Sequence, residues 1–316
     1  SVYLIFDTYR ENFQNTHVFE LSILFLLFFP TFLSIISGQF SFLLFFLLTL
    51  AWIFTRSKKD ILAGLVLGIA LSFKLFTGLF LLIFLIQRRW RLFIWYLGTF
   101  ITCNLVALFV VGIDDHLEYL NIMNSINWYS ASWNASFMGF FTRIFGGSLS
   151  VPFVDSPTKG LILIGIAAIL TLLIIIWVAI IDFSKDLKNI DLVFSITTIS
   201  MLLLSPLGWI YYFVILPIPM VVGWFTAKKF ESNKLKTLLV VAWILCTIPY
   251  TIAMKDITPI DMFSWTGFPS YGLLLFFSIL VYLFYKSQDQ PGETNPSKTN
   301  PFNGTDLAKN SHESPN

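Results

Sequence analysis

The chain has 316 residues, of which 56% are hydrophobic and only 12% are charged, and its formal net charge is +2. Soluble domains average about 25% charged residues, so this composition excludes an ordinary soluble enzyme. The few charges stand in short clusters between apolar runs, and this pattern gives no indication of a nucleic-acid partner. We predict an all-α, polytopic transmembrane bundle surrounded by membrane lipids.

The apolar segments, taken in chain order, reach or approach the ~20 residues that cross a ~30 Å hydrocarbon core. The first residues, from Ser1, resemble the end of an apolar helix that meets a polar loop. We therefore expect the N-terminal part of this domain to be missing. We expect residues 1–285 to form one transmembrane domain and residues 286–316, rich in Pro, Asn and Ser, to form a disordered cytoplasmic tail. The predicted spans are 19–36, 40–54, 92–111, 160–181, 190–206, 210–226, 236–253 and 270–285, and a polar, aromatic loop is predicted over 112–158.

The remaining apolar segment, 61–86, contains one charge, Lys74, and has basic residues at both of its ends. If this segment enters the membrane and returns, ten basic residues of the downstream loops lie inside and three outside, as the positive-inside rule requires. A single crossing would reverse that ratio. We therefore predict a broken helical hairpin whose halves, about 12 residues or roughly 18 Å each, are too short to cross. Lys74 then lies at the break, toward the extracytoplasmic side.

This topology gathers polar and aromatic groups from distant parts of the chain on the outer side. Lys74 either snorkels to the interface or binds an anion such as a lipid phosphate. Arg143 is either an ordinary loop charge or a phosphate contact, for which its planar guanidinium is suited. The adjacent Asp114 and Asp115 are either a helix cap or a catalytic base, and capping is the favoured role. The other candidates are Gln39, Asn134, Ser136, Trp209, Tyr211 and Tyr212.

Two of these groups have structural alternatives. Gln39 follows Gly38, so it can simply belong to a tight turn between two spans. The aromatic residues after Pro206 and Gly208 form either an interfacial belt or a wall on which a sugar ring stacks.

Five motifs follow one another along the chain: Gly38-Gln39, AGLVLGIALSFK from Ala63 to Lys74, RRWR at 88–91, Asn134-x-Ser136 with Gly139 and Arg143, and Ser205-Pro206 with Trp209. Their order resembles glycosyltransferase family 87, a group of multi-spanning enzymes of the GT-C class. The resemblance implies a GT-C-like fold. It also implies an enzyme that transfers a mannose-like hexose from a polyprenyl-phosphate donor and inverts the configuration at the anomeric carbon. The acceptor is a lipid or glycan, and the active face is the extracytoplasmic side of the cell membrane.

The resemblance also assigns roles. Lys74 and Arg143 would contact the donor phosphate. Hydrogen bonds to the sugar, to the acceptor or within the loop itself would come from Gln39, Asn134 and Ser136. The wall of the pocket would be formed by Trp209, Tyr211 and Tyr212. The family's catalytic carboxylate belongs to an outer loop before the first span seen here, so the base is unknown and Asp114 and Asp115 are the in-chain candidates. No metal or cofactor is expected.

A transporter or lipid flippase without chemistry is the alternative class. Such a protein is expected to show inverted repeats and a midplane site open to both sides. No such repeat is visible in the sequence, and the large outer loop with short cytoplasmic loops favours the enzyme.

Overall fold

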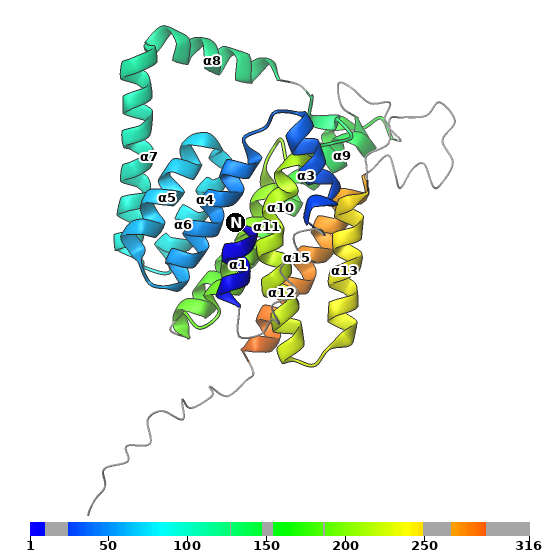
Figure 1. Cartoon of the computed structure of the whole chain (residues 1–316). Coiled ribbons are helices and arrows are strands. Elements are labelled where there is room, and N and C mark those ends of the chain that lie inside the picture. The colour runs from blue at the N-terminus through cyan, green and yellow to red at the C-terminus, as the bar shows by residue number, and fades with distance from the viewer. Residues whose placement is uncertain (10–24, 127, 147–153, 186, 249–266, 289–316) are drawn as a thin grey trace, which may run out of the picture.

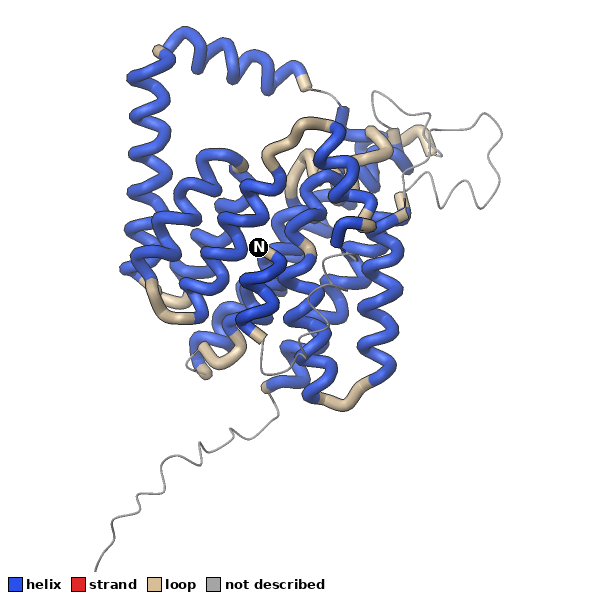
Figure 2. The backbone as a smooth tube through the Cα atoms, viewed as in Figure 1, coloured by secondary structure: helices blue, strands red, loops and turns tan. Residues whose placement is uncertain are grey.

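The computed structural model describes residues 1–9, 25–126, 128–146, 154–185, 187–248 and 267–288 (Figure 1). The regular elements among these residues are helices (Figure 2), and Asn134 and Trp209 form an isolated antiparallel bridge. Three helices, α7, α10 and α15, are long and apolar enough to cross a membrane, which agrees with the predicted helical membrane protein. In chain order the elements are α1 (Val2–Thr8), α3 (Phe29–Ile36), α4 (Ser41–Arg56), α5 (Asp60–Phe73), η2 (Leu75–Gly78), α6 (Leu79–Ile86), α7 (Trp90–Val111), α8 (Ile113–Ser125), η3 (Trp128–Ser130), α9 (Phe137–Phe145), α10 (Pro157–Ser184), α11 (Ile190–Leu204), η4 (Ile210–Ile215), α12 (Pro217–Lys229), α13 (Asn233–Thr247) and α15 (Phe268–Ser287).

Two sequence predictions need correction. The predicted loop 112–158 contains the helices α8, η3 and α9, whose short or strongly polar sequences do not show the apolar run of a span. The predicted span 210–226 is divided into the 3₁₀ helix η4 and the α-helix α12. The division falls at Pro217, which occupies the start of α12, where its missing N–H costs no hydrogen bond. Parts of the predicted spans 19–36 and 236–253, and most of the tail, lie outside the described residues.

The segment 61–86 forms the predicted broken hairpin. Helix α5 ends at Phe73, Lys74 is extended (φ −145°, ψ 108°), and the chain returns through η2 and α6. The 14 residues of α5 reach only about 21 Å at 1.5 Å per residue, which is less than the membrane core. Both basic flanks lie at one end of the bundle, because the Arg89 guanidinium contacts the Asp60 carboxylate and donates to the Thr55 carbonyl oxygen (3.2 Å).

Helices α5 and α7 run in parallel and in close contact. A Cβ atom added to Gly64 would lie 2.7 Å from the Leu92 carbonyl oxygen, and one added to Gly68 would lie 2.5 Å from Thr99 Cβ. These two glycines therefore allow the helix backbones to approach, as small residues four apart commonly do in membranes.

The register of these contacts places Lys74 along α7. Gly64 lies level with residues near 94 and Gly68 with residues near 98, so Lys74 lies level with about residue 104. Helix α7 continues to Val111, which adds roughly 10 Å at 1.5 Å per residue. Lys74 is thus well below the outer end of α7, and in Figure 1 α7 extends past the neighbouring top of α5 before it turns into α8.

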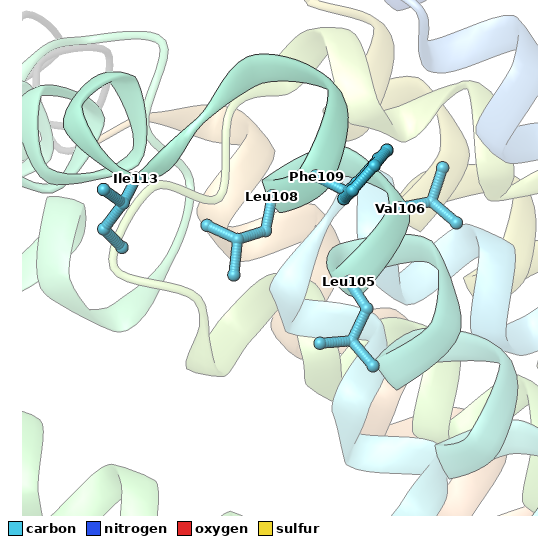
Figure 3. Close-up of a pocket in the computed structure, with 5 residues that line it drawn as sticks. All are labelled: Leu105, Val106, Leu108, Phe109 and Ile113. Carbon is cyan, nitrogen blue, oxygen red and sulfur yellow. The ribbon is translucent and has the colours of Figure 1, made fainter.

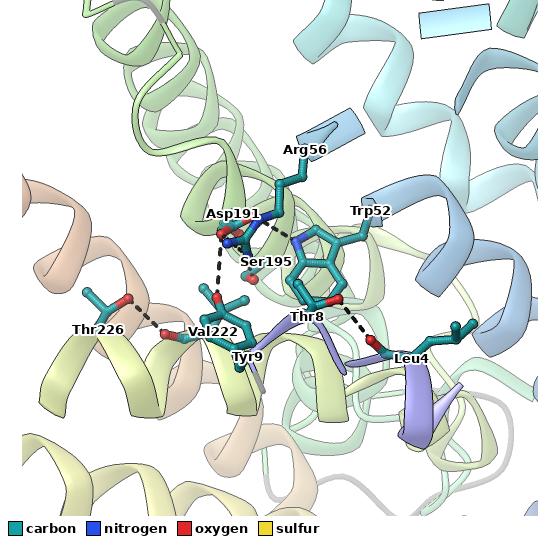
Figure 4. Close-up of polar contacts among 9 residues, drawn as sticks. All are labelled: Leu4, Thr8, Tyr9, Trp52, Arg56, Asp191, Ser195, Val222 and Thr226. Atoms are coloured by element: carbon teal, nitrogen blue, oxygen red, sulfur yellow. Dashed lines mark hydrogen bonds and ion pairs between the residues drawn. The ribbon is translucent and has the colours of Figure 1, made fainter. Parts of the chain in front are cut away.

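The end of the bundle that carries Arg56, Arg88 and Arg89 is called the basic end. Here Asp191, near the start of α11, accepts hydrogen bonds from Trp52 Nε1 and Arg56 Nη1, both at 2.9 Å (Figure 4). Tyr9 adds a longer contact from its hydroxyl, at 3.4 Å. One carboxylate thus ties α4, α11 and the residue after α1 together at this end.

The opposite end, which carries Lys74, α8 and α9, is called the loop end. Helix α8 crosses this end roughly perpendicular to α7 (Figures 1 and 2). Its residues are mostly exposed, with Ile113, Leu117 and Leu120 on one side of the helix. Ile122 is exposed on the opposite side, so large apolar side chains of α8 are exposed on more than one side of the helix.

Candidate active site

Lys74 is placed by the break between α5 and η2, and its side chain is half-buried. Its backbone carbonyl accepts hydrogen bonds from the Thr77 N–H (3.1 Å) and hydroxyl (2.9 Å), which hold the break in shape. The ammonium lies 4.9 Å from the centre of the Tyr212 ring. Within the described part of the chain, Lys74 forms no ion pair with a carboxylate. A cation that lies against an aromatic face, with no carboxylate paired to it among the described residues, retains the capacity to bind an anion.

Trp209, Tyr211 and Tyr212 form one aromatic cluster at the start of η4. The Trp209 and Tyr211 ring centres are 5.1 Å apart, and those of Tyr211 and Tyr212 are 4.6 Å apart. The Trp209 indole N–H is buried without a hydrogen-bond partner. The Tyr211 hydroxyl has Tyr212 as its polar neighbour but forms no hydrogen bond of normal geometry. The structure therefore brings Lys74 and the three predicted aromatic residues into one site.

Asn134 and Ser136 join the two chain segments of the loop end. The fully buried Asn134 amide donates to the carbonyl oxygens of Tyr129 (2.9 Å) and Pro206 (2.8 Å). Its side-chain oxygen accepts from the Ser136 hydroxyl (2.8 Å), and Ser136 in turn caps α9 by accepting from the Gly139 N–H (3.2 Å). Of the roles predicted for these two residues, the contacts support bonding within the loop itself.

Arg143 is fully buried within the same framework. Its Nη1 donates to the carbonyl oxygens of Ala131 and Asn134, both at 2.8 Å, and its Nη2 donates to the Ser270 hydroxyl at 3.4 Å. Burial lowers the pKa of the guanidinium to about 9, so the group is still charged at neutral pH. Arg143 thus connects α9 to the preceding loop and to α15, and this geometry gives it a positioning role beneath the site.

Lys74, Asn134 and Arg143 all lie within a part of the chain that matches a family model. The family model of glycosyltransferase family 87 matches residues 1–206, more than half of the chain. The chain belongs to glycosyltransferase family 87. No curated protein and no solved structure matches the chain. The predicted resemblance is confirmed, and the protein is a membrane glycosyltransferase with a sugar donor and an acceptor as substrates.

The other predicted residues of this glycosyltransferase lie on the rim of the loop end. Gln39 follows Gly38, whose positive φ of +59° forms the tight turn after α3, and the Gln39 N–H donates to the Ser34 carbonyl oxygen (3.1 Å). Asp114 and Asp115 are exposed in the first turn of α8, where negative charge is favourable. The residue at the N-cap is Gly112, so neither carboxylate forms the expected side-chain cap.

Three further polar residues were missed in the sequence. Thr31 and Ser34 lie on the buried side of α3, and Ser41 begins α4, yet the large apolar residues Phe32 and Ile35 of α3 are exposed. The sequence signal that could have identified them is the pair Thr31 and Ser34, two hydroxyl residues three positions apart within an apolar run. Polar groups buried at membrane depth often mark a functional site.

Proposed function

We propose that this glycosyltransferase moves a mannose-like hexose from a polyprenyl-phosphate donor to a lipid or glycan acceptor on the extracytoplasmic face of the membrane. The observation that carries the proposal is the position of Lys74. Its ammonium stands at a helix break inside the bundle, beside an aromatic cluster, and has no carboxylate partner among the described residues. A lipid phosphate supplies the negative charge that this position otherwise lacks.

The reaction chemistry gives Lys74 a defined task. The acceptor hydroxyl loses its proton to a base and attacks the anomeric carbon, while the bond from that carbon to the phosphate oxygen breaks and its electron pair stays on the phosphate. The leaving lipid phosphate therefore gains negative charge in the transition state. A pre-positioned cation beside that oxygen stabilises the developing charge. Attack from the face opposite the phosphate inverts the anomeric carbon.

The aromatic cluster suits the sugar. Trp209 and Tyr212 have parallel rings, with an interplanar angle of 5° and centres 6.4 Å apart, and the Lys74 ammonium lies against Tyr212. Aromatic faces pack against the C–H faces of a hexose, and the buried indole N–H of Trp209 can donate to a ring hydroxyl. Phosphate and sugar would then bind side by side, as they are linked in the donor.

The outer half of α7 suits a lipid-linked donor. Beyond the level of Lys74, the side chains of Phe109 and Val110 are 92% and 74% exposed, on a helix that is able to span the membrane. An open hollow of about 880 Å³ lies between the end of α7 and the start of α8 (Figure 3). The side chains that line it are all apolar, which suits an isoprenoid chain. The lining residues are Leu105, Val106, Leu108, Phe109 and Ile113.

The proposed face follows from the distribution of charge. The basic residues expected on the inside gather at the basic end, where Arg88 packs beside Phe183 and Lys286 beside Phe230. Basic loops are retained on the cytoplasmic side. The loop end, with the site, would then face outward.

The test is the Lys74→Ala variant of the full-length protein in proteoliposomes that contain a mannosyl-phosphoryl-polyprenol and a lipid acceptor. We expect the turnover number to fall by about 10²- to 10³-fold, the usual effect of removing one group that stabilises a developing anion. Lys159→Ala is the matched control, because Lys159 is an exposed lysine in the first turn of α10 at the same end. Wild-type turnover by Lys74→Ala would refute the phosphate role. Passage of the donor across the membrane without any product from the wild type would favour a transporter.

A further inference from the structure

Five buried polar atoms of uncharged side chains at the loop end lack a hydrogen-bond partner of normal geometry. They come from three elements: α3, the first residue of α4, and the start of η4. They are Thr31 Oγ1, Ser34 Oγ, Ser41 Oγ, Trp209 Nε1 and the Tyr211 hydroxyl.

The three elements pack against one another. Helix α3 packs chiefly against η4, and α4 also contacts η4. The Gln39 N–H bond to the Ser34 carbonyl folds the turn back over the end of α3, and this brings the start of α4, with Ser41, toward Ser34. Thr31 and Ser34 are one turn apart on the buried side of α3, so both belong to its packed face. The three elements that carry the five atoms therefore pack together around η4.

The missing hydrogen bonds are not a general property of hydroxyl residues in this bundle. Thr49 and Ser200, equally buried in α4 and α11, each donate to the carbonyl oxygen one turn earlier, at 2.7 Å. Outside the set at the loop end, Thr55 is the one other buried hydroxyl without a partner in the described part of the chain. Buried polar groups are normally hydrogen-bonded, and leaving several unpaired in one place is destabilising.

We propose that these five groups form the subsite that binds the hydroxyl groups of the donor's hexose. This inference rests on the proposed function. Ser, Thr and Tyr hydroxyls both donate and accept, while the indole N–H only donates, and this mixture matches the vicinal hydroxyls of a sugar. These five side chains are uncharged, which suits a neutral polyol. The buried Arg143 at the same end donates to loop carbonyl oxygens, and the phosphate is left to Lys74.

The order of the groups agrees with the connectivity of the donor. Lys74 contacts Tyr212, Tyr212 contacts Tyr211, and η4 then leads to the hydroxyls of α3. A donor whose phosphate is at Lys74 would extend its hexose over the aromatic cluster toward Thr31 and Ser34. The subsite therefore belongs to the donor sugar and not to the acceptor.

The test is the double variant Thr31→Val/Ser34→Ala in the full chain, compared with Thr49→Val/Ser200→Ala, which removes two buried hydroxyls that do have partners. Thermal unfolding in detergent micelles is measured alone, with polyprenyl phosphate, and with mannosyl-phosphoryl-polyprenol. We expect the sugar to add stabilisation beyond polyprenyl phosphate in the wild type and in the control. The subsite variant is expected to lose this added shift, keep the shift from polyprenyl phosphate, and raise the donor KM at least tenfold with the acceptor KM unchanged.

The outcomes separate this inference from the proposed function. If neither lipid shifts the unfolding of the wild type and no sugar is transferred, the donor assignment itself is wrong. If the sugar-specific shift survives in the subsite variant, or if only the acceptor KM rises, the donor-sugar subsite is wrong. A lower unfolding temperature of the ligand-free variant, with donor binding intact, would show that the hydroxyls act only in folding.

Discussion

Replacing Asp191 with Ala should destabilise the basic end, because this one carboxylate receives hydrogen bonds from three side chains, two on α4 and one on the residue after α1 (Figure 4). The loss of its bond to the buried Trp52 leaves an unpaired indole N–H, which costs about 1–3 kcal/mol. The Arg56 side chain is 38% exposed, so its ion pair is screened by solvent and adds only about 0–1 kcal/mol. The 3.4 Å contact from Tyr9 is too long to add much.

Together these contributions predict a loss of about 1–4 kcal/mol in the free energy of unfolding. For a chain of this size that corresponds to a decrease of roughly 2–6 °C in the unfolding temperature. The assay is thermal unfolding of the purified protein in detergent, followed by intrinsic tryptophan fluorescence. Asp191→Asn should lose less, because an amide oxygen still accepts from Trp52. Asp114→Ala is the control, since Asp114 is exposed on α8. If Asp191→Ala and Asp114→Ala unfold at the same temperature, the carboxylate does not hold these helices together.

Two further changes test the packing on which the site depends. Gly68→Ala should lower the free energy of unfolding by about 1–3 kcal/mol, the usual cost of overpacking, because the added Cβ would lie 2.5 Å from Thr99 Cβ. Gly98→Ala, where the added atom has open space around it, is the control in the same unfolding measurement. Asn134→Ala should lower the unfolding temperature and the turnover number together, because the amide joins the loop before α9 to the Pro206 carbonyl. Unchanged unfolding with lost turnover would instead give Asn134 a direct contact with substrate.

Much of the fold followed from local and compositional signals. Apolar run lengths predicted most of the helices, and the distribution of basic residues predicted that the segment around Lys74 turns back. These predictions succeed because desolvation of the backbone and of charges is a strong constraint within a membrane. Helices α8 and α9 were not predicted, because they do not have to cross the hydrocarbon core and so need no long apolar run.

The site was predicted less completely, and the reason is again physical. A motif shows which residue types are present, but the partner of each side chain depends on segments distant in the chain. Arg143 was predicted to be either an ordinary loop charge or a phosphate contact, and its motif could not show that the guanidinium donates to the Ser270 hydroxyl of α15, 127 positions away. Thr31 and Ser34 looked like ordinary members of an apolar run until packing buried their hydroxyls and left them unpaired.

By itself, then, the sequence determined that this chain is a helical membrane protein, that Lys74 stands at the break of a hairpin, and that its motifs resemble those of glycosyltransferase family 87. Hydrophobic run length, charge distribution and motif order are all properties of short segments. Only the tertiary structure decided that Lys74 meets Tyr212 and that Arg143 is enclosed beneath the loop. Lys74 and Tyr212 are more than a hundred positions apart in the chain, as are Arg143 and its partner Ser270. Only the packing of the break after α5 against η4 and of α9 against α15 brings these residues together.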